Sequence, residues 1–423
     1  MIKKFFPTFI ALIVMSMLVV ACAPQPTTTP EATQPPAAET TAPEVTEAPT
    51  VPATETVTEA PQTTQEPIKI GFFSPTTGFA AADGTSALQS AQLAVKIVNE
   101  KGGVLGRQLE LVFYDDAAKP DQTSAIARKL IEQDKVVAGI SGSYSGSTRA
   151  AAPIFQEAGI PMLSAYGIHP EVTKTGNMIF RIGTLADVQG RIGAELIGNV
   201  MNFKKVAILT VDNDFGISLT DGFKKHATDL GLEIVLEEKY PLGETEFRPI
   251  IGKIKSSGAE VVYATGYFNE AANLVSQAKD EGLNIQIVGQ EGYDSPQFVQ
   301  LGGPATEGVV ITTDLNRDSD RPMTKTFLEQ YKATYGEDAD MVGASAFDAV
   351  MVLAYAIQTA GSTDPMAIVN AISNLKNFED VATGPFWGYT ADREVLRPIS
   401  SQIVKDGAFH LYHEFDDLQL VTP

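Results

Sequence analysis

The feature that most constrains this chain is a succession of short apolar segments that alternate with helix-patterned segments from residue 68 onward. The apolar segments have the length of buried strands, and turn-forming residues bound many of them. Between them, apolar residues recur at helical spacing, as at Leu88, Ala91, Val95 and Val98. Repeated strand–helix units predict an α/β fold with parallel sheets that carry helices on both faces.

The predicted elements fall into two series. The first series of strands covers 68–73, 109–114, 136–140, 162–164 and 179–181, and the second covers 206–210, 234–240, 261–264, 285–288 and 309–312. Helices are predicted at 86–99, 124–133, 216–230 and 269–280, with another that begins near Ser147. Because the region from residue 68 to residue 423 is longer than one typical domain, we expect two Rossmann-like lobes. Ligands of such folds bind beyond the carboxyl ends of the strands, often between lobes.

The N-terminus has the pattern of an export signal. Lys3 and Lys4 precede an apolar run that ends at Ala21, and Cys22 is the only cysteine of the chain. Residues 19–22, which read Val-Val-Ala-Cys, resemble the bacterial lipobox. This resemblance implies that a signal peptide at 1–21 is cleaved off and that Cys22 is lipidated. The mature protein is then expected outside the cytoplasm, lipid-anchored to a bacterial membrane. An uncleaved anchor or an ordinary signal peptide is the alternative.

Residues 22–67 differ in composition from everything that follows. After Cys22 this segment consists almost entirely of Thr, Pro, Ala, Glu, Gln and Val, without Lys, Arg, Gly or aromatic residues. Such a composition cannot bury enough apolar surface to offset the entropy of ordering, so a disordered linker is predicted. It would act as a tether, and a mucin-like glycosylated stalk is an alternative with the same effect.

The globular region is strongly acidic. The chain carries a net charge of -21, and without the two leader lysines and the seven linker glutamates the remainder carries -16. A nucleic-acid-binding protein needs a basic stripe for the phosphates, so no nucleic-acid partner is expected. Peripheral docking on an anionic membrane is disfavoured for the same reason.

Common catalytic and cofactor motifs are missing from the sequence. It contains neither common type of Gly-rich phosphate loop, no HExxH and no Gly-x-Ser-x-Gly, and one cysteine cannot build a thiolate metal site. We therefore expect no enzyme activity, no cofactor and no metal. A Ser-His-Asp triad stays open, because its members lie far apart in sequence.

Several stretches that follow one another in order resemble the branched-chain amino acid (Leu/Ile/Val) binding proteins of ABC transporters, which have the type I periplasmic-binding-protein fold. The two most specific begin at Asn99 and at Tyr114 and read Asn-Glu-Lys-Gly-Gly and Tyr-Asp-Asp-Ala-Ala-Lys-Pro. The matching stretches are 99–106, 114–120, 157–162, 170–173, 289–292, 305–308 and 383–386.

The resemblance implies a domain organisation and a function. One lobe would hold 68–184 and 316–396, the other 185–315 and 397–423, and the chain would cross a hinge three times. The protein would be a monomer that captures an amino acid or a related small polar ligand and delivers it to an ABC permease. A sensory module for a membrane receptor or kinase is the main alternative, and an extracytoplasmic enzyme on the same scaffold is another.

The same resemblance implies ligand-binding residues. Ser145 would bind the ligand carboxylate together with backbone amides of Ser147 and Thr148, at a helix N-terminus that favours anions. Glu291 matches the carboxylate that binds the ammonium, and Tyr267 matches its aromatic partner. The alternative for Ser145 is an N-cap role without a ligand. The alternative for Glu291 is a structural salt bridge, and the alternative for Tyr267 is packing at a helix start.

Three positions depart from the family pattern. Ile168 stands where a threonine hydroxyl usually binds the ligand. Tyr166 replaces a small residue whose carbonyl usually takes part in ligand binding. Asp83 stands where an aromatic residue usually lines the pocket. Two carboxylates, Asp83 and Glu291, would then face the cleft, which favours a ligand with additional positive or hydrogen-bond-donating groups over leucine.

Overall fold

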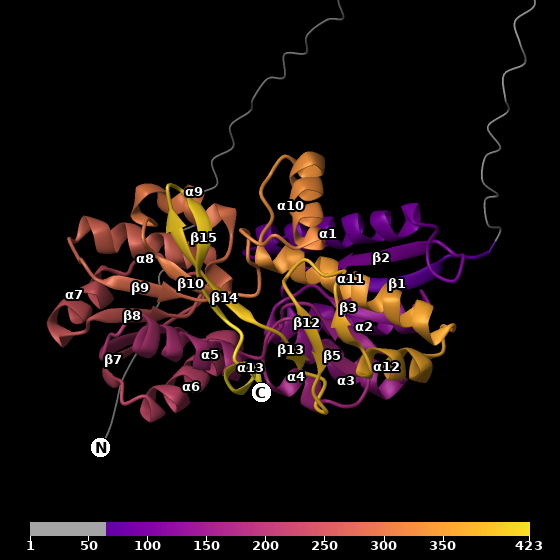
Figure 1. Ribbon diagram of the computed structural model, residues 1–423, viewed down its shortest axis with the longest axis horizontal. Coiled ribbons are helices and arrows are strands. Elements are labelled where there is room, and N and C mark those ends of the chain that lie inside the picture. The colour runs from indigo at the N-terminus through magenta and orange to yellow at the C-terminus, as the bar shows by residue number, and fades with distance from the viewer. Residues whose placement is uncertain (1–64) are drawn as a thin grey trace, which may run out of the picture. The chain divides into compact units, whose positions relative to one another are not determined.

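A computed structural model describes residues 65–423 (Figure 1). The predicted signal peptide, Cys22 and nearly all of the predicted linker lie outside the described residues. The predictions about cleavage, lipidation and tethering therefore remain predictions.

The first sheet contains five strands that all pair in parallel, in the order β2-β1-β3-β4-β5 (Figure 1). Its strands are β1 (Ile68–Ser74), β2 (Leu109–Asp115), β3 (Ala138–Ser141), β4 (Met162–Ser164) and β5 (Ile179–Arg181). Its crossover helices are α1 (Ala81–Glu100), α2 (Pro120–Glu132), α3 (Ser145–Ala158) and the short α4 (Glu171–Lys174). The predicted strands and helices of this region are confirmed, although α1 begins five residues earlier than predicted and so includes Asp83.

The second sheet has seven strands in the order β15-β14-β10-β9-β8-β6-β7. The parallel strands are β6 (Lys205–Val211), β7 (Glu233–Tyr240), β8 (Val261–Ala264), β9 (Gln286–Gly289) and β10 (Val310–Thr313). The helices of this part are α5 (Ala186–Glu195) with its π-helical extension η1 (Leu196–Val200), α6 (Asp214–Asp229), α7 (Arg248–Ser257), α8 (Phe268–Asp280), α9 (Pro296–Gly302), α13 (Leu418–Val421) and the single 3-10 turns η2 (Glu291–Tyr293) and η3 (Gly303–Ala305).

An antiparallel hairpin, β14 (Ile399–Lys405) and β15 (Ala408–Phe415), extends the second sheet beyond β10. The sequence analysis did not predict this hairpin. Its two-residue loop is Asp406-Gly407, and both residues have positive φ angles, of 54° and 76°. Asp-Gly between two apolar runs is a strong hairpin signal, so the turn itself was the clue that could have revealed these strands.

Three helices and a small antiparallel sheet return to the first sheet. They are α10 (Pro322–Tyr335), α11 (Met341–Ala360), α12 (Pro365–Ser373), β11 (Lys376–Phe378), β12 (Phe386–Tyr389) and β13 (Val395–Leu396). Helix α11 is long and apolar enough to cross a membrane, but 89% of its most apolar stretch is buried within the protein. It is apolar on all sides because it lies inside the core beside α1.

The segments between the two sheets are tied together by buried polar contacts. Asp314, which follows β10, accepts hydrogen bonds from the Thr184 backbone N–H at 2.8 Å and from its hydroxyl at 2.7 Å. Arg397, which precedes β14, donates to the Ile182 carbonyl at 3.3 Å. One apolar core surrounds the first sheet with α10–α12, and two others flank the second sheet. We propose that each sheet with its surrounding cores forms one lobe, and that the lobe boundaries are those predicted from the sequence.

Candidate functional site

The N-terminus of α3 follows the carboxyl end of β3. The residue before the helix, Tyr144, makes no side-chain cap, so the first amides of α3 retain donor capacity. Ser145, the first helical residue, is 2% exposed, and its hydroxyl has no hydrogen-bond partner. A buried, unsatisfied hydroxyl beside free amides favours an anionic ligand group.

Glu291 lies directly beyond β9, and a close approach of two loops fixes its position. The loop after β9 runs so close to the loop after β8 that a Cβ atom at Gly292 would clash with the Gly266 carbonyl oxygen. The Gln290 side chain reinforces this contact, since it donates to the Gly266 carbonyl at 2.9 Å and accepts from the Gly292 N–H at 2.8 Å. Glu291 is thereby brought to the same cavity as Tyr267.

A second close approach positions Asp83 in the first turn of α1. A Cβ atom at Gly84 would clash with the Pro75 backbone, and the Ser74 hydroxyl donates to the Gly84 carbonyl at 2.8 Å. The start of α1 is therefore held against the carboxyl end of β1. Asp83 is 4% exposed, and its Oδ2 accepts a hydrogen bond of 2.6 Å from the Tyr144 hydroxyl.

These residues meet in one cavity that is bounded by elements of both sheets. Its lining residues are Asp83, Tyr144, Ser145, Tyr166, Phe215, Tyr267, Glu291, Gly292, Met341 and Val342. The free volume is about 20 Å³, which is room for about one water molecule. In this arrangement the protein's own side chains fill the space between the sheets, so a ligand would have to displace some of them.

Aromatic rings form much of the wall. Tyr144 stacks on Tyr267 with ring centroids 4.5 Å apart, and Phe215 stacks on the same ring at 5.1 Å. Tyr144 also contacts Phe79 at 5.8 Å and Tyr166 at 6.2 Å. Stacked and edge-on pairs at these distances are favourable beyond the area they bury. The segments that follow strands of the first and the second sheet therefore contact each other here through aromatic rings.

The structure brings together five of the predicted ligand-binding residues: Asp83, Ser145, Tyr166, Tyr267 and Glu291. The side chains of the other three do not line the cavity. Thr148 directs its hydroxyl to Ser141 Oγ at 2.7 Å and to backbone carbonyls, and Ser147 is buried beside the Asp116 carboxyl. Ile168 lies in an apolar core of the second sheet.

The sequence analysis missed Tyr144, Phe215, Met341 and Val342, which also line the cavity. Tyr144 could have been predicted, because it directly precedes Ser145 at the start of the helix. Phe215 and Met341 lie just inside the starts of α6 and α11, after the N-caps Asn213 and Asp340. For Phe215, a helix start directly after strand β6 is the local signal that would have pointed to it, whereas α11 follows α10 and offers no such signal for Met341.

The pKa of Asp83 is raised to about 7, chiefly by burial and next by the nearby Asp340 carboxylate, while the hydrogen bond from Tyr144 acts to lower it. Burial also raises the pKa of Glu291, with the Asp314 carboxylate acting in the same direction and Arg181 against it. Glu291 accepts a hydrogen bond of 2.8 Å from Gln189. Both carboxyls thus lie where their charged forms are costly unless a cation binds them.

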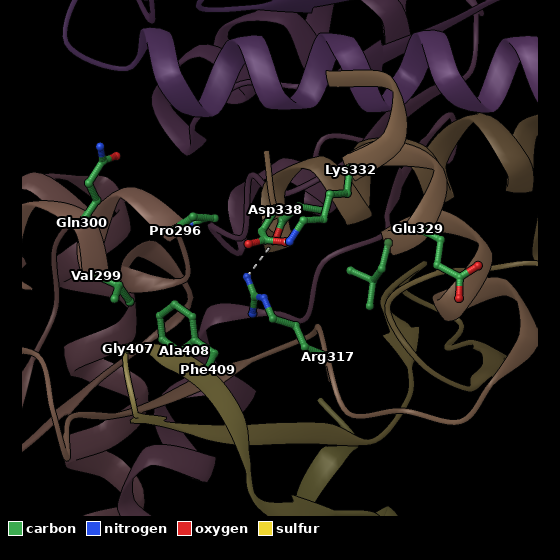
Figure 2. A pocket seen from close by; sticks show the side chains of 12 residues that line it. Pro296, Val299, Gln300, Arg317, Glu329, Lys332, Asp338, Gly407, Ala408 and Phe409 are labelled. Atoms are coloured by element: carbon green, nitrogen blue, oxygen red, sulfur yellow. Dashed lines mark hydrogen bonds and ion pairs between the residues drawn. The ribbon is translucent and has the colours of Figure 1, made fainter. Parts of the chain in front are cut away.

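A larger cavity lies elsewhere and contains none of the predicted residues (Figure 2). Its volume is about 580 Å³, and it is lined by α9, α10, Arg317 and the β14–β15 turn. Arg317 lies over the Phe409 ring, with its Cζ atom 4.9 Å from the centroid, and Lys332 pairs with Asp338 at 2.7 Å (Figure 2). In residues 65–423, no group of three or more His, Cys, Asp or Glu side chains is arranged to hold a metal ion.

The chain belongs to the periplasmic binding protein family, whose model matches residues 67–408. It is 32% identical over 306 residues to the leucine-, isoleucine-, valine-, threonine- and alanine-binding protein of Pseudomonas aeruginosa, which covers 72% of this chain and 82% of that protein. The crystal structure of the branched-chain amino acid transporter substrate binding protein LivJ from Streptococcus pneumoniae, in complex with isoleucine, matches with a TM-score of 0.76 and 28% identity. The match covers 82% of this chain and 99% of that one.

A solute binding protein of an ABC transporter from Rhodopseudomonas palustris, in complex with 3,4-dihydroxybenzoic acid, matches with a TM-score of 0.77 and 25% identity, over 83% of this chain and 98% of that one. The type I periplasmic-binding-protein fold expected from the sequence is therefore confirmed. The ligands of these relatives, amino acids and an aromatic acid, differ widely in charge and shape, so ligand identity has to be inferred from the residues of this chain.

The raised pKa of Asp83 predicts that stability falls as pH rises. Between about pH 4 and pH 7 the folded state keeps a proton on this carboxyl that the unfolded state releases, so the free energy of unfolding decreases across that window. Asp83→Asn keeps an acceptor for Tyr144 and removes the charge. We expect it to be more stable than the parent at pH 8, by on the order of a few kcal/mol, and less different at pH 4.

Urea unfolding of the full chain at the two pH values measures this difference. Asp392→Asn, at an exposed position, is the matched control and should leave the pH dependence unchanged. A pH dependence in Asp83→Asn equal to that of the parent would contradict the prediction.

Proposed function

We propose that this protein is the solute-binding component of an ABC importer and that it captures an amino acid or a related small polar ligand between its two lobes. The observation that carries the proposal is the pairing of a free helix N-terminus at Ser145 with a buried carboxylate at Glu291 in one cavity. These two groups complement the carboxylate and the ammonium of an amino acid. Membership of the family supports the same class of ligand, as do the amino-acid ligands of the Pseudomonas aeruginosa and Streptococcus pneumoniae relatives.

Each site residue has a role that follows from its chemistry. The Ser145 hydroxyl and the first amides of α3 would donate to the ligand carboxylate. Glu291 would accept from the ammonium, and the Tyr267 ring beside it would add cation–π attraction. Tyr166 would bound the ligand on the side of the first sheet.

Capture would work by a shift of population between open and closed states. Contacts between the parts of the protein that carry the two sheets hold the closed arrangement: Tyr144 stacks on Tyr267, and Arg149 pairs with Asp214. A ligand that touches both Ser145 and Glu291 makes its full set of contacts only when the lobes are closed. Its binding would therefore favour closure, and opening at the permease would release it unchanged.

The lipid anchor at Cys22 and the linker that follows belong to this proposal. A tether keeps a receptor close to its permease and raises its local concentration there. We propose that the protein is anchored outside the cytoplasm as a monomer and has no enzyme activity.

Truncation of the two ligand-binding side chains should weaken binding without unfolding the protein. Removing a hydrogen bond to a charged group costs about 1.5–3 kcal/mol, so Ser145→Ala is expected to weaken amino-acid binding about 10–100-fold. Glu291→Gln is expected to weaken it at least as much, because it removes the partner of the ammonium. Isothermal titration calorimetry would follow a thermal-shift screen of the proteinogenic amino acids, which identifies the titrant.

Ser256→Ala and Glu132→Gln change the same residue types at exposed positions and serve as controls. If both site variants bind the selected amino acid as tightly as the controls do, the ligand does not lie in this cavity.

Replacement of Cys22 tests the anchor. In a bacterial host that lipidates exported proteins, the parent should incorporate radiolabelled palmitate and fractionate with membranes. Cys22→Ser should do neither and should appear in the soluble extracytoplasmic fraction. A Cys22→Ser protein that remains membrane-bound would instead indicate an uncleaved apolar segment as the anchor.

A further inference from the structure

We infer that the ligand carries a second cationic group, bound by Asp83, in addition to the ammonium bound by Glu291. The inferred ligand is an amino acid with a positively charged side chain. This inference rests on the proposed function, because it adds a subsite to the cavity that is assigned there.

The cavity contains two buried acidic side chains and no basic one among its described lining residues. Asp83 and Glu291 are 4% and 3% exposed, and the lining residues in the described part of the chain include no Lys, Arg or His. An amino acid with a neutral side chain brings one ammonium and therefore neutralises one carboxylate. The other would stay buried without a cation, and it would then be either charged, which is costly, or protonated.

Nearby arginines are already committed to other carboxylates. Arg181 pairs with Glu394 at 2.6 Å, and Arg317 pairs with Asp294, with Nη1 and Oδ2 3.1 Å apart. Arg149 pairs with Asp214. Within residues 65–423, the Asp83 side chain accepts a hydrogen bond only from the neutral hydroxyl of Tyr144, so the cation for this carboxylate would come from the ligand.

Tyr144 occupies the position where the second cationic group would bind. Its hydroxyl donates to Asp83 at 2.6 Å, while its ring stacks on Tyr267 across the cavity. One neutral hydrogen bond uses only part of the acceptor capacity of a carboxylate. A ligand ammonium or guanidinium would replace this contact with a stronger, charge-assisted one.

The aromatic residues that line the cavity also favour a cationic ligand group. A cation near Asp83 would also lie near the rings of Tyr144 and Tyr166, whose faces attract positive charge. An apolar side chain in this place would bury the Asp83 carboxylate without a partner. The unpartnered Ser145 hydroxyl, 2% exposed in the same cavity, independently indicates that a polar ligand group completes the site.

Matched pairs of amino acids test the inference directly. L-ornithine and L-norvaline have the same carbon chain, and only ornithine carries the side-chain ammonium. L-lysine and L-norleucine form a second such pair. With the full chain in detergent at pH 7.5, calorimetry should give tighter binding of at least one cationic member than of its neutral partner, by at least tenfold.

Asp83→Asn should reduce that ratio to near one, because the substitution removes the charge and keeps a hydrogen-bond acceptor for Tyr144. Asp392→Asn, at an exposed position, should keep the ratio of the parent. A ratio near one in the parent, or a ratio that Asp83→Asn leaves intact, would overturn the inference while the proposed function stands. Failure of the parent to bind any proteinogenic amino acid or any of the four probes would overturn the proposed function itself.

Proton release gives a second readout of the same contact. The groups that act on Asp83 are Tyr144 before α3, Asp340 before α11, and the carboxylates of Glu270 and Asp294, and Asp83 is partly protonated near neutral pH. A cation that binds Asp83 expels this proton. Ornithine binding at pH 6.5, measured in buffers of different ionisation enthalpy, should release more protons from the parent than from Asp83→Asn. Equal proton release from the two proteins would contradict a cation at Asp83.

Discussion

Parallel strand pairing is the constraint on which the rest of this structure depends. In a parallel sheet every strand ends at the same edge, so the segments that follow β1, β3 and β4 gather at one edge of the first sheet. The segments that follow β6, β8 and β9 do the same in the second sheet. The cavity is lined from both edges, which is why residues more than two hundred positions apart meet in it.

The chemistry of the site follows from burial at those edges. The helical turns at those edges bring three polar groups that the protein leaves incompletely satisfied: the Ser145 hydroxyl, the Glu291 carboxylate and the Asp83 carboxylate. Such groups cost stability in the free protein and are expected at sites where a ligand completes the interactions. The stacked rings of Tyr144 and Tyr267 fill part of the space between the two sheets. The cavity is therefore prepared for a charged ligand at the expense of the stability of the unliganded state.

Much of the fold could be predicted from the sequence, because buried parallel strands are short apolar runs and their crossover helices have a clear period. The β14–β15 hairpin was missed although Asp406-Gly407 marks its turn. In the site, the resemblance to the family led to Ser145, Tyr267 and Glu291, which do line one cavity. For Ser147 and Thr148 it implied ligand contacts through the backbone amides, and the Thr148 N–H donates to the Tyr144 carbonyl at 2.9 Å within the helix. Contacts across the cavity, such as Tyr144 with Tyr267, depend on how the two sheets are placed and leave no local pattern.

The central claim is that an amino acid binds in this cavity with its carboxylate at Ser145 and its ammonium at Glu291. A crystal structure of the protein with the amino acid selected by thermal shift tests it most directly. The account predicts a ligand carboxylate within hydrogen-bond distance of the Ser145 hydroxyl and the first amides of α3, and an ammonium within the same distance of the Glu291 carboxylate. A ligand found instead in the cavity beside Arg317 and Phe409, or one that contacts neither Ser145 nor Glu291, would contradict it.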